Sequence, residues 1–297
     1  MILDKKQGEA FLAVTDTGSF EQAAARLQLT ASAVSQRVRA LEMQLGQPLL
    51  VRSRPCRATR AGQRLLRYLV RATLLDDEFL AETAAEQAAP LSVAIAVNAD
   101  SLATWFLPAL GDFLNREHVL IDLIVDDQDH TYALLEAGQA LGCVSSEPRP
   151  LRGCVAEPLG VMRYRALAAP GFRGRWFPHG MTAEAVRRAT VLVFNRKDRL
   201  QSGFLERKFR LPPGTYSCHH IPASEPFMQA VLLGFGWGMV PDLQAGRQLA
   251  SGELVELAPD DPIHVGLFWH SWKVQSPRLE RLSQAVIQAA RRVLDKG

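Results

Sequence analysis

The sequence has few cysteines, and their spacing suits neither metal binding nor a disulfide framework. The four are Cys56, Cys143, Cys154 and Cys218, and no two of them form a Cys-x-x-Cys pair. Structural zinc sites and disulfide-rich secreted domains both need closely spaced cysteines. We therefore expect reduced structural thiols. The alternative, a redox sensor built on Cys143 and Cys154, lacks the neighbouring basic residues that would lower a thiol pKa.

Long hydrophobic runs and a secretion signal are also missing. No apolar stretch approaches the roughly 20 residues that span a bilayer. The N-terminus, MILDKKQGEAFLAV, contains acidic residues and has no apolar core followed by a small-residue cleavage site. We expect a cytoplasmic protein with no membrane partner.

The sequence also lacks a recognisable set of catalytic residues. No Ser/His/Asp trio and no metal-ligand spacing stands out in the sequence. The glycines of GFGWGMV precede a predicted strand instead of following one, which argues against a nucleotide-binding fingerprint. We therefore expect no enzyme activity, no cofactor and no metal site.

Positive charge is present, but it is concentrated in one part of the chain. The 297 residues carry a net charge of only +3. Residues 20–72 nevertheless contain ten arginines and two acidic residues, whereas residues 73–87 contain five acidic residues and no basic one. A compact basic block near one end of a nearly neutral chain indicates a polyanionic partner.

Helical patterns cover the chain to about residue 88. Ser19 and Gln22 form a capping box at the start of one short helix, and Thr30 is placed to cap the next. A tight link joins these two helices. From Thr59 a longer helix carries a wide apolar stripe, for which a second copy of the same helix is a reasonable partner.

The stretch LTASAVSQRVRALEMQLG, residues 29–46, predicts an amphipathic helix with an unusual polar face. Its buried face consists of Val34, Val38, Leu41 and Leu45. Its outward face carries Ser32, Ser35, Gln36 and Arg39. Serine is a modest helix former, so this clustering does not serve helix stability. Taken alone, the outward face fits a solvated surface equally well.

The neighbouring segments favour DNA binding. The preceding short helix gives the arrangement of a helix-turn-helix, whose second helix enters the major groove with its N-terminal residues at the base edges. The following segment, GQPLLVRSRPCRATRAG, places four arginines in a turn-rich stretch suited to a wing along phosphates or in the minor groove. Each good bidentate side-chain contact with a base contributes about 1–3 kcal/mol of discrimination.

After Pro90 the pattern changes to alternating strands and helices. The predicted strands include LSVAIAV (91–97), LIDLIV (120–125), ALGCVSS, TVLVFN (190–195), WGMVP and HVGLFWH (264–270). Helical segments lie between them and after the last one, at 276–295. Such alternation is typical of parallel α/β sheets. Two α/β lobes of similar size fit residues 91–297.

The segment FEQAAARLQLTASAVSQRVRALEMQLGQPLLVRS, followed by TRAG, resembles the N-terminal domain of the LysR-type transcriptional regulators. The later pattern of linker helix, two lobes and GFGWGMVP matches the same family over the full length. The resemblance implies an α plus α/β fold class. Residues 1–60 would form a winged helix-turn-helix, residues 61–89 a linker and dimerisation helix, and residues 90–297 a two-lobed effector-binding domain like a periplasmic binding protein. Lobe I would comprise about 90–162 and 266–297, and lobe II about 163–265.

The resemblance also implies partners and contacts. The expected partners are promoter double-stranded DNA, a small-molecule effector, RNA polymerase and further copies of the chain, as a dimer or a dimer of dimers. The expected DNA-binding residues are Thr30, Ser32, Ser35, Gln36 and Arg39 in the major groove, with Arg52 and Arg54 in the wing. Ala31 departs from the family, which often has glutamine there, so base recognition at that end rests on the two serines or on DNA shape.

The segments SVAIAVNADSLATWFLPAL, VRSRPCRAT and ASGELVEL are similar to the ArgP/LysG subgroup, regulators of arginine and lysine export that respond to basic amino acids. An effector carboxylate would suit the helix that begins near Asp100, because helix N-termini favour anions. Its cationic side chain would need acidic partners, and an Asp126–Asp127 pair is the first candidate. The full set of expected effector-binding residues is Asn98, Asp100, Ser101, Asp126, Asp127, Asp129, Asn195, Asp198 and Glu225.

Alternatives to this interpretation remain open, both for the acidic residues and for the function. Each of these acidic residues also fits a helix cap or a solvated loop, and the effector could be a different small molecule. A ligand-independent architectural DNA-binding protein would also explain the arginine block. A solute-binding receptor would explain residues 91–297, but it leaves the arginines unused and lacks an export signal.

Overall fold

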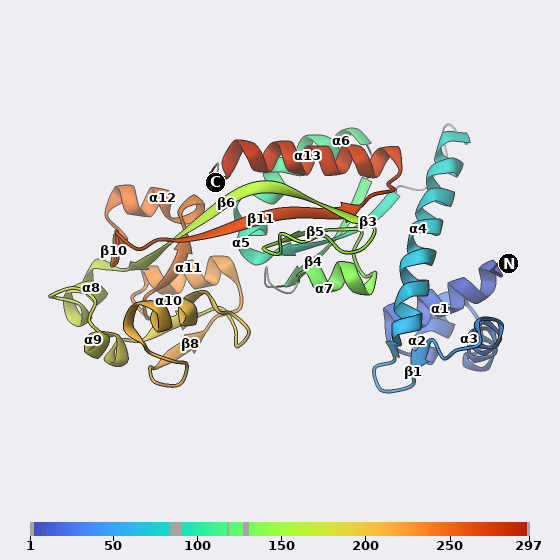
Figure 1. Cartoon of the computed structure of the whole chain (residues 1–297), viewed down its shortest axis with the longest axis horizontal. Helices are drawn as coiled ribbons and strands as arrows, with labels where there is room; N and C mark the ends of the chain where they lie inside the picture. Colours follow the sequence, from blue (N-terminus) through green and yellow to red (C-terminus); the bar gives the residue numbers. More distant parts are fainter. Residues whose placement is uncertain (1–2, 84–90, 118, 127–130, 296–297) are drawn as a thin grey trace. The chain divides into compact units, whose positions relative to one another are not determined.

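The structure is a computed structural model that describes residues 3–83, 91–117, 119–126 and 131–295 (Figure 1). The chain divides into two compact units, residues 1–92 with 133–141 and residues 93–132 with 142–297. Among the described residues, no helix is long and apolar enough to cross a bilayer.

The N-terminal segment is helical with one short hairpin. Its elements are α1 (Lys5–Thr17), α2 (Phe20–Leu27), α3 (Ala31–Leu45), β1 (Leu50–Val51), β2 (Arg57–Ala58) and α4 (Arg60–Thr83). The predicted caps are confirmed, because Ser19 Oγ accepts from the Gln22 amide at 3.4 Å and Thr30 Oγ1 accepts from the Ala33 amide at 3.1 Å. The long helix begins one residue after its predicted start.

One hydrophobic core holds α1, α2 and α3 together. Phe11 and Val14 of α1 pack with Val34 and Val38 of α3, and all four are fully buried. The first turns of α4 join this core through buried leucines, Leu65 and Leu66. Beyond them α4 exposes Tyr68, Leu75 and Phe79, with exposed fractions of 57%, 50% and 65%.

The second unit is built on a seven-stranded sheet. Its strands are β3 (Leu91–Asn98), β4 (Val119–Asp126), β5 (Gly142–Ser145), β6 (Cys154–Ala168), β9 (Gly238–Pro241), β10 (Val255–Glu256) and β11 (Ile263–Trp272). The order is β10-β6-β11-β5-β3-β4, with β9 paired to β6. Three helical segments follow β3 in succession: α5 (Ala99–Ser101), the π-helix η1 (Leu102–Phe106) and α6 (Leu107–Glu117). Figure 1 shows α6 and α13 (Pro277–Val293) on the same face of the sheet.

The remaining elements of this unit surround a smaller two-stranded parallel sheet of β7 (Val191–Val193) and β8 (Cys218–His220). The helices here are α8 (Pro170–Trp176), α9 (Ala183–Arg188), α10 (Leu200–Phe209), α11 (Ser224–Leu232) and α12 (Asp242–Ser251). α7 (Thr131–Ala137) precedes β5 in the chain, and its residues from Ala133 onward belong to the first unit. The buried Trp237 contacts Phe177 and Phe204 edge-on and so fixes the centre of this part.

The expectation of parallel sheets is wrong for the larger sheet. β3 and β5 pair in parallel, but β11 runs antiparallel to both β5 and β6, and β6 runs antiparallel to β9. The 15-residue β6 was not predicted at all. Together β6 and β11 carry the sheet from one α/β part of the unit to the other, as Figure 1 shows.

The cysteines give a first testable prediction. Burial raises the pKa of the Cys143 thiol, Cys154 is 1% exposed, and neither forms a disulfide, whereas Cys218 is exposed. Because only the thiolate reacts with alkylating reagents, iodoacetamide at neutral pH should label Cys218 in the native protein and spare Cys143 and Cys154. Peptide mass spectrometry before and after denaturation measures this. Rapid labelling of Cys143 in the native protein would favour the redox-sensor interpretation.

Candidate functional site

The polar face predicted for α3 is present on the surface of the first unit. Ser32, Gln36 and Arg39 are exposed and Ser35 is half-buried, while the opposite face of the helix is packed into the core. Thr30 directs its hydroxyl at the Ala33 amide and so fixes where α3 begins. The first two turns therefore present a contiguous hydrogen-bonding surface to solvent.

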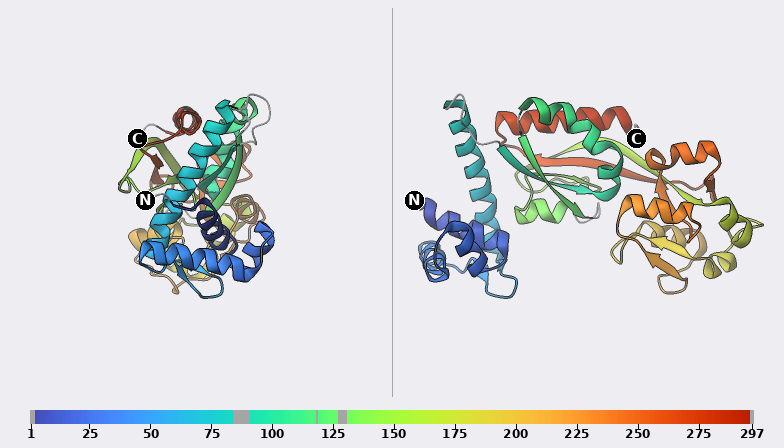
Figure 2. Two further views of the ribbon diagram at one scale, coloured as in Figure 1. Left: turned by 90° about the vertical axis from the view of Figure 1, so that its right-hand side faces the viewer. Right: turned by 180° about the vertical axis from the view of Figure 1, so that it is seen from behind.

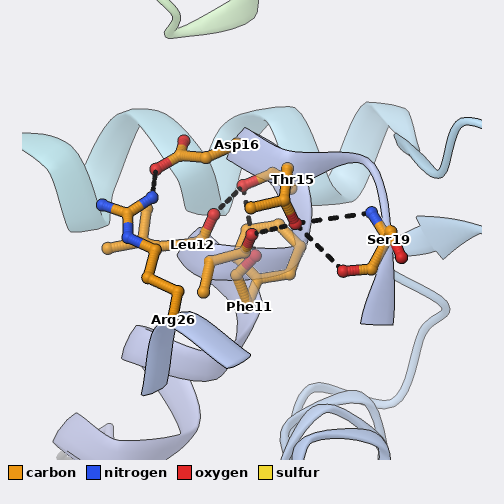
Figure 3. Close-up of polar contacts among 8 residues, drawn as sticks. Phe11, Leu12, Thr15, Asp16, Ser19 and Arg26 are labelled. Carbon is orange, nitrogen blue, oxygen red and sulfur yellow. Dashed lines mark hydrogen bonds and ion pairs between the residues drawn. The ribbon is translucent and has the colours of Figure 1, made fainter. Parts of the chain in front are cut away.

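The position of α2 against α1 depends mainly on packing. Figure 3 shows an ion pair between Arg26 of α2 and Asp16 of α1, with Nη1 and Oδ2 2.9 Å apart. In the same view the Thr15 hydroxyl donates to the Leu12 carbonyl of its own helix at 2.8 Å. Exposed ion pairs contribute only about 0–1 kcal/mol. The buried core, more than this pair, sets the angle between the two helices and hence the orientation of α3.

The hairpin of β1 and β2 forms the predicted wing, and its loop projects away from the helices (Figure 2). Glu42 of α3 holds it in place, because its Oε1 accepts from the amides of Leu49 and Leu50 at 2.8 and 3.3 Å. Arg52 lies 3.8 Å from Glu42 Oε2 and stacks over the Phe20 ring at 5.4 Å.

Arg54 is exposed in the wing loop, so the two predicted wing arginines have different surroundings. Arg57 of β2 is also exposed on the wing. It was absent from the predicted contact set, although the same run of arginines contains it.

A pocket in the second unit brings together four of the residues predicted to bind an effector. Its cavity volume is about 30 Å³, and the space around it is open to solvent. Its predicted members are Asn98, Asp100, Asp126 and Asp198. The other lining residues are Ala99, Phe194, Leu200, Gln201, Phe227, Met239, Pro241 and Gln244. They come from both α/β parts of the unit, so the pocket lies where these parts meet.

Asp100 connects three elements inside this pocket. The Tyr164 hydroxyl of β6 donates to its Oδ2 at 2.9 Å, and the Ser224 hydroxyl of α11 donates to its Oδ1 at 2.6 Å. Gln244 of α12 in turn donates to the Ser224 carbonyl at 3.3 Å. Neutral hydroxyl donors orient the carboxylate without cancelling its charge, so Asp100 remains a partner for a cation.

Asp198 and Asn195 stabilise the loop between β7 and α10 through hydrogen bonds to its backbone. Asp198 accepts from the amides of Phe194 and Leu200 at 3.2 and 2.7 Å, which closes the loop that leads into α10. Asn195 Oδ1 accepts from the amides of Lys197 and Asp198 at 2.7 and 3.1 Å. Asp198 still lines the pocket, whereas Asn195 does not.

Two further predicted residues in the described part of the chain, Ser101 and Glu225, do not line the pocket. Ser101 is fully buried behind it, and Glu225 is exposed on α11, where it lines a separate hollow with Leu233 and Phe235. Asp127 and Asp129 lie outside the described residues.

Two buried amides in the pocket have unused hydrogen-bonding capacity. Asn98 and Gln201 are each 2% exposed. Among the described residues, Nδ2 and Oδ1 of Asn98 and Oε1 of Gln201 have no hydrogen-bond partner. Buried polar atoms without partners cost about 1–3 kcal/mol each, so their presence at a cavity indicates a polar ligand. Gln201 was not predicted, because glutamine within a helix is usually exposed.

The charges around the pocket are acidic. Among the described residues, the carboxylates of Asp100, Asp126 and Asp198 line it, and none of the described lining residues is a lysine, arginine or histidine. Lys197 approaches from outside the lining, with Nζ 3.8 Å from Asp126 Oδ1. Carboxylates together with buried amides suit a ligand that carries positive charge and several hydrogen-bonding groups.

Comparison with known families matches both parts of the chain. Residues 6–63 match the bacterial regulatory helix-turn-helix family of the LysR type, and residues 87–291 match the LysR substrate-binding domain. The transcriptional regulator ArgP of Aeromonas salmonicida is 41% identical over 99% of both chains. The regulator LysG of Mycobacterium tuberculosis is 43% identical over 97% of this chain and 94% of the relative.

Solved structures agree with these matches. The crystal structure of ArgP from Mycobacterium tuberculosis has a TM-score of 0.86 and 43% identity, with both chains fully covered. Full-length LysG from Corynebacterium glutamicum with bound effector Arg has a TM-score of 0.80 and 35% identity, covering 99% of this chain and all of that one. These proteins are regulators and not enzymes. The chain therefore belongs to the LysR family of transcriptional regulators, among relatives named ArgP and LysG.

Proposed function

We propose that this regulator binds promoter DNA through residues 1–60 and senses lysine or arginine in the pocket of residues 90–297. The observation that carries the ligand assignment is the acidic pocket itself, where, within the described part of the chain, three aspartates accompany two buried amides whose atoms have no hydrogen-bond partner. A basic amino acid offers two cationic groups for the carboxylates and a carboxylate for amide donors. The relative with bound arginine supports this choice.

The DNA-binding assignment rests on the exposed polar face of α3 and on the wing. Thr30, Ser32, Ser35, Gln36 and Arg39 are assigned to the major groove, and Arg52 and Arg54 to the wing contacts. Phosphate contacts from such arginines set affinity and register, whereas base contacts specify sequence. The ten arginines of residues 20–72 supply the electrostatic attraction.

The assembly that we propose is a homodimer, or a dimer of dimers, formed through residues 61–89. Tyr68, Leu75 and Phe79 of α4 are half to two-thirds exposed, and their spacing of seven and four residues places them on one side of the helix. An exposed apolar stripe of this kind suits a second copy of the helix. The expected setting is the cytoplasm, where promoter DNA and RNA polymerase are available.

Regulation requires that the ligand distinguish two arrangements of the protein. A ligand that binds both arrangements equally shifts neither population. The pocket lies between the two α/β parts, about 90–162 with 266–297 and about 163–265, which we assign as the lobes of the effector domain. The target gene that we propose encodes an exporter of basic amino acids.

Calorimetric titration of the purified protein with lysine, arginine, histidine, leucine and glutamate tests the ligand assignment. Binding is expected for the basic amino acids alone, because glutamate adds a negative charge to an acidic pocket and leucine leaves the carboxylates unpaired. If the protein binds none of the five but still prefers its promoter over random DNA, the family assignment stays intact and the proposal of a basic amino acid as effector is overturned.

A further inference from the structure

Lys197 is a cation of the protein itself that reaches a carboxylate of the ligand pocket. Its Nζ lies 3.8 Å from Asp126 Oδ1. Asp126 ends β4, whereas Lys197 lies in the loop between β7 and α10, so the ion pair joins the two α/β parts of the unit. The side chain of Lys197 is 60% exposed and that of Asp126 is 30% exposed.

The loop fixes the backbone of Lys197 while its side chain is largely exposed. Asn195 Oδ1 accepts the Lys197 amide at 2.7 Å, and Asp198 closes the same loop by accepting the amides of Phe194 and Leu200. A fixed Cα with a long, exposed side chain allows the ammonium group to reach Asp126 and also to leave it at little cost.

The ammonium group of Lys197 is chemically the same group that a lysine ligand would present. With Asp100 and Asp198, Asp126 makes the lining of the pocket acidic. A cationic ligand that pairs with Asp126 therefore meets a carboxylate that already has a cation of the protein beside it.

We infer that Lys197 is an internal competitor, which pairs with Asp126 in the ligand-free protein and is displaced by the cationic end of the effector. This inference rests on the proposed function, because it presupposes a cationic ligand at Asp126. Displacing an exposed ion pair weakens ligand binding by a modest factor, about two- to fivefold. Lys197 thereby raises the effector concentration at which the regulator responds.

The test is calorimetric titration of the full-length protein with lysine and with arginine. The variant Lys197→Met keeps the length of the side chain and removes its charge. It should bind both amino acids about two- to fivefold more tightly than the unmodified protein. The matched control is Arg196→Met, which removes a positive charge from the neighbouring, exposed residue. The control should give a smaller change, because no ion pair to Asp126 is lost.

A second comparison separates competition at Asp126 from a general charge effect. In a protein that already carries Asp126→Asn, adding Lys197→Met should change affinity no more than adding Arg196→Met does. Competition is overturned if Lys197→Met alone leaves affinity unchanged, weakens it, or matches the control. The outcome for the proposed function is read separately, from the unmodified protein: if it binds neither basic amino acid, the cationic effector itself is wrong and the competitor role falls with it.

Discussion

Changing Asp126→Asn is expected to weaken the binding of lysine and arginine by roughly 30-fold, about 2 kcal/mol. Removing one partner of a buried charge pair commonly costs about 2–5 kcal/mol, and the lower end applies here because the Asp126 side chain is 30% exposed. The asparagine keeps the shape and hydrogen-bonding capacity of the side chain, so the loss reports its charge. Calorimetric titration with both amino acids measures it.

The control for this change is Asp260→Asn, which removes a negative charge from an exposed residue of the same unit. It should leave the affinity for both amino acids within about twofold, and neither variant should alter binding to promoter DNA in the absence of ligand. Equal affinity in the Asp126→Asn variant and the unmodified protein would mean that the cationic group pairs with another carboxylate, of which Asp100 is the next candidate.

The helical N-terminal domain was predictable because its signals are local. Ser19 and Thr30 cap helices through contacts three residues away, and the apolar spacing of α3 is set by the helical repeat alone. The wing was expected from its turn-rich sequence. The contact that anchors it, from Glu42 to the amides of Leu49 and Leu50, joins residues seven and eight apart, and no pattern indicated it.

The mixed sheet was harder to predict from the sequence, because strand direction depends on contacts between distant residues. The segment Cys154–Ala168 was not recognised as a strand. Arginines and apolar residues alternate along part of it, and they face different surroundings: Tyr164 is buried, whereas Arg165 pairs with Asp242 and Glu256. Its antiparallel pairing with β11, about 100 residues later in the chain, has no local signature.

The residues of the pocket were likewise predictable only where a local sequence pattern indicated them. Asp126 was chosen because polar residues after strands often face a shared edge, and it lines the pocket, whereas its contact with an effector stays a prediction. Glu225 was expected in the same polar ring by analogy with where effectors lie in the family, which does not fix the direction of a side chain on α11. Ser224 and Phe227 of that helix are buried, and Glu225 therefore points to the surface.

Joining the two sites in one chain has a thermodynamic consequence. If the effector changes the affinity for promoter DNA by some factor, then promoter DNA must change the affinity for the effector by the same factor. Comparing calorimetric titrations of free and promoter-bound protein therefore measures the coupling between α3 and the pocket directly. A factor of one would mean that the ligand regulates transcription by some route other than promoter affinity.

Replacing Ser35 and Arg39 together by alanine is expected to lower the preference for promoter DNA over random DNA by roughly 10- to 1000-fold. A bidentate base contact, which Arg39 can make, contributes about 1–3 kcal/mol of discrimination, and the single hydrogen bond of Ser35 adds less; both residues lie on the face of α3 opposite the core. Alanine favours helix formation at least as well as serine or arginine, so α3 should remain intact. Fluorescence anisotropy with promoter and random duplexes at fixed salt gives the ratio of the two affinities. The charge control is Arg247→Ala, which removes an exposed arginine of α12.

If the double variant loses promoter and random binding equally, these residues contact phosphates, and sequence recognition rests on Ser32, Gln36 or DNA shape. Lysine binding should be unchanged in either case.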